Sequence, residues 1–333
     1  MVELVRERLI NHLLIFLLGS LISLFGFTLI GMLHAGIRRH RSRQPASLGL
    51  LLADVYPKDM YSGPTARMDR VNFLPTNLLV RPLLDVIMML LVIAMGGELA
   101  SLFSGALSHM FGRVLQLPSA AVAVVVIQTV LTFFGAEFGV YVFHRLEHEN
   151  AVLWRIHGVH HSAEKLNFFT GTRDHPVETV LITIAKTVGV GLFVGLALFV
   201  GGFKLMPQSF FYSSLFLVCF HGFYAGHSHS HMPISFGPVL NVLIGGPVMH
   251  QIHHSAEAHM FNKNYGMATN LFDWLFGTLY MPRPGEVYRW GLNDEEYGAN
   301  NPHQTLRDFY LKPVLEVLAL SRSGLRDLLQ RLI

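Results

Sequence analysis

Long stretches without formally charged residues dominate the pattern of polar and apolar positions along the chain. Residues 9–33 form a run of 25 uncharged residues, and residues 114–136 form another of 23. A hydrocarbon core about 30 Å thick needs roughly 20 apolar residues in a helix. Residues 83–103 are a third candidate, although Asp85 and Glu98 lie near their ends. These runs predict membrane-spanning helices, and the first is too long for the core of a signal peptide.

Two further apolar runs follow one another in the second half of the chain. Residues 179–203 carry a single lysine and residues 205–226 carry no formal charge. Two glycines and a proline lie where the runs meet, which predicts a tight hairpin between two spans. Residues 233–249 are also uncharged, but Gly-Pro and Gly-Gly-Pro sequences break them. They are therefore expected to form an interfacial or buried segment.

The composition agrees with a membrane protein. Of the 333 residues, 51% are hydrophobic and 14% are charged, whereas soluble domains carry about 25% charged residues. The mean hydropathy is +0.42. A net charge of +3 without a concentrated basic stripe gives no indication of a nucleic-acid partner. The only cysteine, Cys219, excludes an internal disulfide and a thiolate metal cluster.

The distribution of basic residues predicts an orientation in the membrane. Because basic loops face the cytoplasm, the segment between the first two spans is expected on that side. Counting spans onward then places residues 144–175, and everything after residue 226, on the cytoplasmic face as well. All the histidine clusters described below are therefore expected on one side. The basic residues of the first loop are Arg38, Arg39, Arg41, Arg43, Lys58, Arg67, Arg70 and Arg81.

Histidine is the unusual residue of this chain. There are 19, and 14 of them lie between His144 and His259. Three clusters have helical spacing, which places their members on one face of a helix and predicts that the imidazoles point toward a common centre. The clusters are His144 and His148 in HRLEH, His157, His160 and His161 in HGVHH, and His250, His253 and His254 in HQIHH.

The number of clustered histidines predicts two metal ions. These eight, with His227 of GHSHSH as an expected ninth, exceed the four protein ligands that one zinc ion accepts. Two ions with roughly four ligands each fit the number. Imidazole binds zinc, copper, iron and nickel, so the ligand type does not select the metal. A dinuclear site beside a bilayer suits oxygen activation against a C–H bond.

The four histidine-containing segments resemble the fatty acid hydroxylase/sterol desaturase superfamily in order, spacing and flanking residues. VFHRLEHEN resembles the HR-x-x-H box. LWRIHGVHHSAEKLNFFTGTRDHPVE resembles the W-x-x-H-x-x-HH box with its R-x-HP-x-E continuation. GHSHSHMP resembles the HSN-x-x-x-P element, with His229 where the family often has asparagine. PVMHQIHHSAEAHMFNKNYGMATNLFDWLFGTLY is similar to the P-x-x-H-x-x-HH box with its NYG and D-x-x-FGT continuation.

The resemblance implies a set of metal ligands. They are His144, His148, His157, His160, His161, His227, His250, His253 and His254. Residues of lower rank, either as ligands or as groups that orient ligands, are His175, His229, His231 and Asp273. The carboxylates nearest to the ligands in sequence, which are expected to orient imidazoles, are Glu147, Asp174 and Glu178.

The resemblance also implies a fold and an activity. The expected fold is all-α, a multi-pass helical membrane protein with a cytoplasmic helical cap that carries a His-rich dimetal site. The expected activity is hydroxylation of a lipid C–H bond by two iron ions, with O2 as cosubstrate and an external electron donor such as a reductase, a ferredoxin or a cytochrome b5-like protein. Desaturation at the same site is the alternative. The expected membrane is the bacterial inner membrane or the endoplasmic reticulum.

The chain is expected to divide into three regions around one catalytic unit. Residues 1–110 form an N-terminal membrane region with the Arg-rich loop. Residues 111–285 form the hydroxylase-like catalytic region. Residues 286–333 form a C-terminal cytoplasmic tail with helical periodicity from residue 306.

Two other classes of protein compete with the oxygenase. HRLEH matches H-x-x-E-H, an inverted zinc-protease pattern, with Glu147 as its carboxylate. A membrane zinc hydrolase would leave the two HxxHH clusters without a role. A metal transporter would carry its ionisable ligands inside the spans, whereas the clusters lie beyond the predicted span ends.

Overall fold

The computed structural model describes residues 2–112, 117, 120–292 and 301–320, and these residues are almost entirely helical, with no strand. The only β pairing in the described part is an isolated bridge between Ser255 and Trp290. This confirms the all-α prediction. The long helices are α1 (Val2–Arg41), α4 (Arg81–Phe111), α5 (Ala121–Glu149), α7 (Pro176–Gly201) and α8 (Gln208–Ser228). The short ones are α2 (Leu48–Val55), α3 (Pro64–Pro75), the π-helix η1 (Thr76–Val80), α6 (Ala151–His161), α9 (Pro238–Leu243), α10 (Pro247–His253), α11 (Leu271–Phe276), α13 (Leu306–Tyr310) and the 3-10 turns η2 (Thr170–Thr172) and η3 (Ala258–Met260).

Four helices are long and apolar enough to cross a membrane, which agrees with an integral membrane protein. These candidate spans are Leu18–Arg41, Leu90–Phe111, Ala121–Glu149 and Pro176–Gly201. A further span was predicted for residues 205–226, where the structure has the continuous helix α8. The side chains of residues 217–225 lie outside the described part, so that span stays a prediction.

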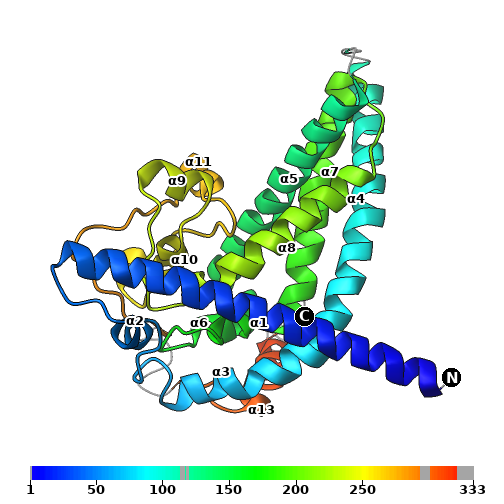
Figure 1. The fold of residues 1–333 in the computed structure, drawn as a ribbon. Coiled ribbons are helices and arrows are strands. Elements are labelled where there is room, and N and C mark those ends of the chain that lie inside the picture. The colour runs from blue at the N-terminus through cyan, green and yellow to red at the C-terminus, as the bar shows by residue number, and fades with distance from the viewer. Residues whose placement is uncertain (1, 113–116, 118–119, 293–300, 321–333) are drawn as a thin grey trace, which may run out of the picture.

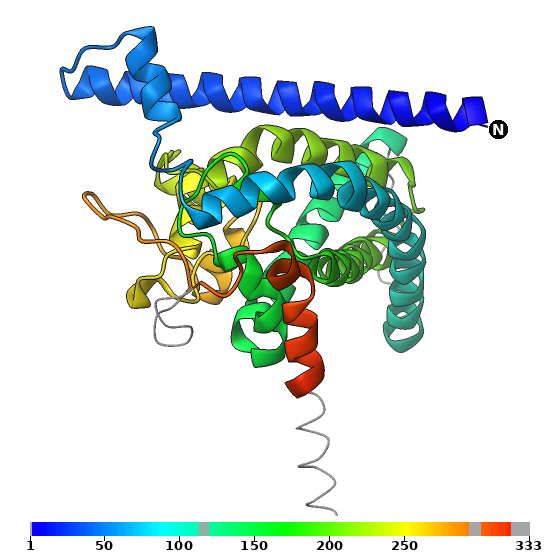
Figure 2. The same ribbon diagram turned by 90° about the horizontal axis from the view of Figure 1, so that it is seen from below.

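Helices α4, α5 and α7 stand side by side, and α1 lies across them rather than alongside (Figures 1 and 2). Glycines allow α5 and α7 to approach closely. A Cβ atom added to Gly139 would overlap the carbonyl oxygen of Ala185, and one added to Gly189 would overlap that of Gly135. Small residues at helix crossings are the usual device for close packing in membranes. The seam holds the end of α5, which carries His144 and His148, firmly against α7.

The remaining short helices form a cap at one end of this bundle (Figure 1). A buried ion pair between Arg173 and Asp69 ties the cap together. The guanidinium also donates to the Val159 carbonyl oxygen at 3.0 Å, to Ser162 Oγ at 2.9 Å and to the His303 carbonyl oxygen at 3.2 Å. One side chain thus joins α3, the end of α6 and the segment before α13.

Candidate metal centre

Nine histidines gather into two adjacent groups at the junction of the bundle and the cap. Group A consists of His144, His148, His157, His161 and His253, and group B consists of His160, His229, His250 and His254. Eight of the nine are buried, and His148 is half-buried. The members come from α5, α6, the residue after α8, and α10 with the residue that follows it. Segments far apart in the sequence therefore meet at one place.

The Nε2 atoms of each group converge at the spacing of ligands on a shared ion. In group A, the Nε2 atom of His157 lies 3.1 Å from those of His144 and His148 and 3.0 Å from that of His161. In group B, the corresponding distances are 3.3 Å for His229 to His160 and 3.0 Å both for His250 to His229 and for His254 to His250. Imidazole nitrogens bind a metal at about 2.0–2.1 Å, so two ligands of one ion lie roughly 3.0–3.4 Å apart.

Hydrogen bonding alone does not account for this convergence. A neutral imidazole nitrogen carries either one hydrogen or one lone pair, so His157 Nε2 can satisfy only one of its three Nε2 neighbours. The Nε2 atom of His253 is buried without a hydrogen-bond partner among the described residues. An ion that accepts several lone pairs at once satisfies all these atoms. The residues present therefore fit a pair of metal ions.

The two HxxHH clusters do not each serve a single ion. His157 and His161, four residues apart, belong to group A, while His160 between them belongs to group B. The second cluster has the reverse arrangement, with His250 and His254 in group B and His253 in group A. The prediction that each cluster points toward a common centre was therefore wrong in detail. Each cluster is shared between both groups.

Backbone carbonyls and a carboxylate orient three imidazoles of group A. His144 Nδ1 donates to the Tyr265 carbonyl oxygen at 2.7 Å, and His253 Nδ1 donates to the Lys263 carbonyl oxygen at 2.8 Å. His157 Nδ1 donates to Glu178 Oε1 at 2.9 Å. Because these acceptors need the hydrogen on Nδ1, each Nε2 presents a lone pair to the centre of the group. Such contacts fix both tautomer and ring orientation at metal sites.

Asp273 acts on this arrangement from a distance. Its carboxylate accepts from the backbone nitrogens of Tyr265 and Gly266, both at 2.8 Å, and from Thr278 Oγ1 at 2.7 Å. It is fully buried and is not a member of either histidine group. Its contacts hold the loop whose Tyr265 carbonyl orients His144. Of the two roles considered for Asp273, the structure gives it the geometry of the orienting one.

Group B has fewer such contacts in the described part of the chain. His160 Nδ1 lies 3.1 Å from Asp174 Oδ1, a distance typical of an ion pair, but the alignment required for a hydrogen bond is not met. The buried Nδ1 atoms of His250 and His254 have no hydrogen-bond partner among the described residues. The ring of His254 in group B also stacks on that of His161 in group A, at 4.4 Å between ring centroids.

The electrostatic environment keeps the imidazoles neutral. Burial, followed by the neighbouring imidazoles, holds the pKa of His157, His161, His250 and His254 well below the usual value of 6.5. The pKa of His253 is lowered in the same way, and its bond to the Lys263 carbonyl opposes the shift only in part. A metal binds the neutral ring. The site is therefore ready to bind metal at neutral pH without first losing protons.

His227 and His229 exchange the positions that the sequence predicted for them. His227, the expected ninth ligand, is buried on the last turn of α8 with its ring 4.9 Å from that of Phe27 and its Nε2 atom 3.3 Å from the Phe27 carbonyl oxygen. His229, given a lower rank, lies in group B instead. Side chains two positions apart on an α-helix point to roughly opposite sides, and here His227 faces Phe27 while His229 faces group B. Sequence spacing separates the two rings but does not show which of them faces the site.

The other residues of lower rank lie outside both groups. His175 caps α7, because its Nδ1 atom accepts from the Val177 nitrogen at 3.2 Å and its Nε2 atom donates to the Tyr310 carbonyl oxygen at 3.1 Å. His231 donates from Nε2 to the Asp54 carbonyl oxygen at 2.8 Å. His175 and His231 thus make structural hydrogen bonds, and neither belongs to group A or group B.

A cavity of about 350 Å³ opens onto group A. His148, His161 and His253 form part of its wall, together with Trp154 and Asn262. The ring of Trp154 lies 5.1 Å from that of His148 and 5.4 Å from that of His161. The cavity is therefore a route by which a small or extended molecule can reach the imidazoles.

The fold and the site define an integral membrane protein with a buried, histidine-lined candidate dimetal centre. A model of the fatty acid hydroxylase family matches residues 129–278, a segment that contains all nine gathered histidines. Residues 129–278 are therefore similar to a fatty acid hydroxylase domain, and the relatives that match the chain are members of the superfamily that the resemblance predicted.

Three relatives illustrate the range of the superfamily. The chain is 30% identical to alkylglycerol monooxygenase of Homo sapiens over 156 residues, which are 47% of this chain and 31% of the relative. It is 31% identical to the ornithine lipid hydroxylase OlsE of Rhizobium tropici over 161 residues, 48% of this chain and 44% of the relative. It is 27% identical to Delta(7)-sterol-C5(6)-desaturase of Nicotiana tabacum over 150 residues, 44% of this chain and 47% of the relative.

The matched segment thus spans less than half of each of these relatives. All three are oxidoreductases by their names. No solved structure matches the chain.

Proposed function

We propose that this chain is a membrane-bound di-iron oxygenase that hydroxylates a C–H bond of a lipid. The convergence of nine imidazoles into two groups carries the proposal, because their Nε2 atoms lie at the spacing of ligands on two neighbouring ions. The names of the relatives, a monooxygenase, a lipid hydroxylase and a sterol desaturase, support oxidation of a lipid. Dioxygen is the proposed cosubstrate.

Each group would hold one iron ion. His144, His148, His157, His161 and His253 would bind the first, and His160, His229, His250 and His254 would bind the second. Bound iron would supply the activation of dioxygen that a C–H bond requires, which no side chain of the site can supply by itself. This assignment replaces His227 by His229 and keeps the other eight proposed ligands.

The residues around the ions have three tasks in this proposal. The backbone carbonyls of Lys263 and Tyr265, together with the Glu178 carboxylate, hold three rings in the metal-binding orientation. Burial of eight of the nine imidazoles limits the access of water to the side where the cavity opens onto group A. The cavity beside Trp154 admits the reacting part of the substrate to group A.

Hydroxylation is preferred over desaturation, the alternative outcome at the same site. Both begin with removal of a hydrogen atom from carbon, and the position of the substrate decides the outcome. Two of the three relatives described above are named for inserting oxygen. The third relative is named as a sterol desaturase, so desaturation is kept as the alternative activity.

The position of Glu147 supports the oxygenase over a zinc hydrolase. A hydrolase would need this carboxylate beside the metal-bound water. Glu147 is buried, and its Oε2 atom lies 3.8 Å from His157 Nδ1, whereas the Nε2 atom of the same ring meets the other imidazoles. Glu147 and Glu178 therefore flank the outer nitrogen of His157, away from the point where the Nε2 atoms converge.

The electron donor and the orientation complete the proposal. The sequence has no glycine-rich dinucleotide motif and no haem-attachment motif, which supports a separate reductase, ferredoxin or cytochrome b5-like donor. The histidine groups would face the cytoplasm, on the side that the Arg-rich loop predicts. The membrane would be the bacterial inner membrane or the endoplasmic reticulum.

The test combines metal analysis with lipid analysis. The protein is purified in detergent for iron and zinc determination, and lipid extracts of cells with and without the chain are compared by mass spectrometry. The expected result is iron in the wild type and a lipid heavier by one oxygen atom. A lipid lighter by two hydrogens would assign desaturation, and zinc with an unchanged lipid profile would refute the oxygenase.

Matched variants connect the result to the site. His161→Ala combined with His254→Ala removes one ligand from each group and should abolish both bound iron and the oxidised lipid. His259→Ala is the control, because His259 lies in the same region but is not in either group and its side chain is 57% exposed. Iron retained by the double variant would contradict the ligand assignment.

A further inference from the structure

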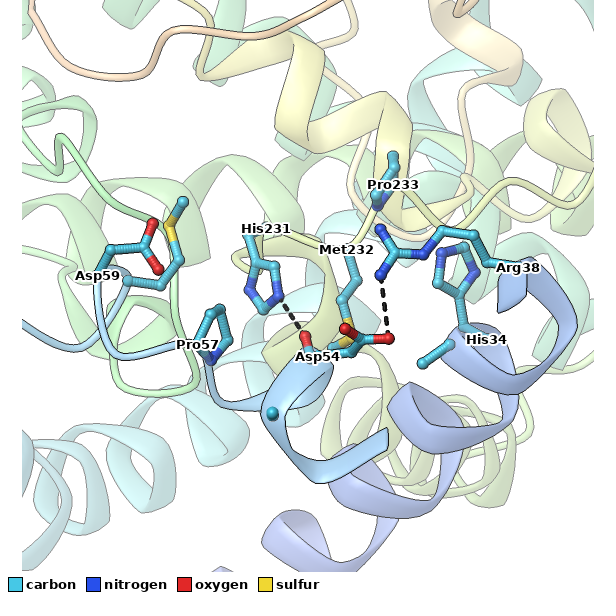
Figure 3. Close-up of a pocket in the computed structure, with 11 residues that line it drawn as sticks. His34, Arg38, Asp54, Pro57, Asp59, His231, Met232 and Pro233 are labelled. Carbon is cyan, nitrogen blue, oxygen red and sulfur yellow. Dashed lines mark hydrogen bonds and ion pairs between the residues drawn. The ribbon is translucent and has the colours of Figure 1, made fainter. Parts of the chain in front are cut away.

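A second polar pocket lies outside the metal centre, where three segments meet. It has a volume of about 270 Å³ and is lined by the C-terminal part of α1, by α2 with the turn after it, and by residues 231–233 (Figure 3). Residue 231 follows the group B histidine His229 by two positions. None of the residues that line this pocket belongs to either histidine group.

One end of this pocket carries a surplus of positive charge. The Asp54 carboxylate accepts two hydrogen bonds from Arg39, at 2.7 and 2.9 Å, and forms an ion pair with Arg38 at 3.1 Å. Two guanidinium groups thus share one carboxylate. The side chain of Arg38 is still 60% exposed, and His34 lies beside it in the pocket wall (Figure 3). Arg38 therefore has free surface with which to bind an anionic group.

The other end of the pocket accepts hydrogen bonds. Asp59 lies on the opposite side of His231 from Arg38 (Figure 3), and its carboxylate acts electrostatically on the His231 ring. Because His231 Nε2 donates to the Asp54 carbonyl oxygen, its Nδ1 atom is an acceptor, and this buried atom has no hydrogen-bond partner among the described residues. That atom is too buried to meet a ligand, so the Asp59 carboxylate is the group at this end that suits a cationic donor such as an ammonium group.

The two helices that line the pocket, α1 and α2, also carry exposed apolar side chains. Leu29, Leu33 and Ile37 on α1 are exposed by 56%, 63% and 46%, and Leu48 on α2 by 64%. In an integral membrane protein such a surface lies among acyl chains. The last turn of α1 is basic, with Arg38, Arg39, His40 and Arg41, as expected where a helix reaches the lipid headgroups. The pocket is therefore placed at the depth of the headgroups.

We infer that this pocket binds the headgroup of a zwitterionic lipid. Arg38 and His34 hold its anionic group, Asp59 holds its ammonium group, and its acyl chains lie along the exposed leucines of α1 and α2. This site goes beyond the proposed oxygenase function and needs no metal. Its test measures binding, so that its failure and the failure of the oxygenase proposal are separate results.

The test measures lipid binding to the detergent-purified full chain by native mass spectrometry. The probes are dihexanoyl phosphatidylethanolamine, which carries phosphate and ammonium, and dihexanoyl phosphatidylglycerol, which carries phosphate alone. A third probe, glycerophosphoethanolamine, has the same zwitterionic headgroup without acyl chains. The wild type should bind the ethanolamine lipid most tightly. Equal binding of the chain-free probe would assign the pocket to a soluble metabolite and overturn the lipid.

Variants locate the binding in this pocket. Arg38→Gln and Asp59→Asn should each weaken binding of the ethanolamine lipid about tenfold, the effect of losing one charge-assisted hydrogen bond. Asp59→Asn should leave phosphatidylglycerol binding unchanged. The matched controls are Arg41→Gln, on the same basic turn, and Glu257→Gln, an exposed carboxylate elsewhere. Unchanged binding in both pocket variants would overturn the site.

Two further results decide the chemistry of the ligand. If Asp59→Asn has no effect and phosphatidylglycerol binds as well as the ethanolamine lipid, the pocket is an anion site and the zwitterionic assignment is wrong. An unchanged midpoint of thermal unfolding in each variant shows that the chain has folded, whether or not it holds iron. A fold defect therefore does not imitate the expected loss of binding.

Discussion

The two histidine groups differ in how the protein holds their rings. In group A, hydrogen bonds from Nδ1 fix three rings, to the carbonyls of Lys263 and Tyr265 and to Glu178. In group B, the buried Nδ1 atoms of His250 and His254 have no hydrogen-bond partner in the described ranges of the chain. Two sites of the same ligand type thus have different degrees of orientation.

This difference predicts unequal affinity for metal. Removing a group that orients a metal ligand typically lowers metal affinity by 10–100-fold. Group A has such groups on at least three of its members, and it also has five ligands against four. Group A should therefore hold its ion more tightly. Group B should have the more adjustable coordination, which suits the ion whose ligands change during a reaction.

Removing one ligand from each group should give the largest difference. His254→Ala should empty group B and retain roughly half of the wild-type iron, because the oriented ligands of group A remain. His157→Ala leaves group A with four imidazoles, two of them oriented by backbone carbonyls, and should retain more iron than His254→Ala. Metal analysis of both variants checks this. Equal iron contents would break the proposed inequality.

The carboxylates behind the two groups offer a finer comparison. Glu178→Gln weakens the acceptor for His157 Nδ1 and should lower the metal affinity of group A by about 10–100-fold. Asp174→Asn should change the affinity of group B by less than about threefold, because Asp174 is 34% exposed and not aligned with His160. Metal-binding titrations of the two variants measure both effects. A larger loss in Asp174→Asn would reverse the comparison.

Removal of metal by a chelator should separate the groups in time. The unequal orientation predicts two phases, with group B emptied about tenfold faster than group A. The phases are followed by the iron remaining on the protein after rapid desalting. The His254→Ala variant identifies them, because it should lack the fast phase and retain the slow one. A single phase in the wild type would show that the ions leave together.

The smallest expected effect is a loss of folding stability in acid. It should act on both histidine groups equally, because it arises in the cap that supports them both. Burial lowers the pKa of His303 to about 4, against a usual value of 6.5. As the pH falls below about 6.5, the unfolded chain takes up a proton at His303 and the folded chain does not, so stability decreases. Thermal unfolding at several pH values should show a weaker pH dependence in His303→Gln than in the wild type.

The control for the His303 prediction is the ratio of the two rates at which a chelator removes iron from group A and group B. The His303 carbonyl accepts from Arg173, which also holds the end of α6. Since α6 supplies histidines to both groups, loosening it should act on both. A changed ratio of the two phases in His303→Gln would show that the cap supports one group selectively.

Local spacing along the chain predicted most of the helices and eight of the gathered histidines, because both depend on residues close together in sequence. The apolar runs correspond to α1, α4, α5 and α7. The spacing did not decide between His227 and His229, because it does not show which side of α8 faces the other histidines; the structure places His229 in group B.

Contacts between distant segments could not be predicted in the same way. The Lys263 and Tyr265 carbonyls orient imidazoles, but backbone oxygens are present at every residue and leave no pattern in the sequence. The division of each HxxHH cluster between two groups likewise depends on how α6 and α10 face each other. The crossing of α1 over the bundle (Figures 1 and 2) also results from packing between segments that meet only in the folded chain.

Because α10 contributes histidines to both groups, neither group can form fully until that helix has been synthesised. In the proposed assignment, group A is complete only when residue 253 has been synthesised and group B only when residue 254 has been, because His253 belongs to group A and His250 and His254 belong to group B. Ribosomes add about 5–20 residues per second, so the stretch from residue 161 to residue 254 takes roughly 5–20 s. During that interval five histidines wait without their later partners, and copper or zinc competes for them more strongly than Fe²⁺. Correct loading therefore depends on which metal the cell makes available after the last span has been inserted.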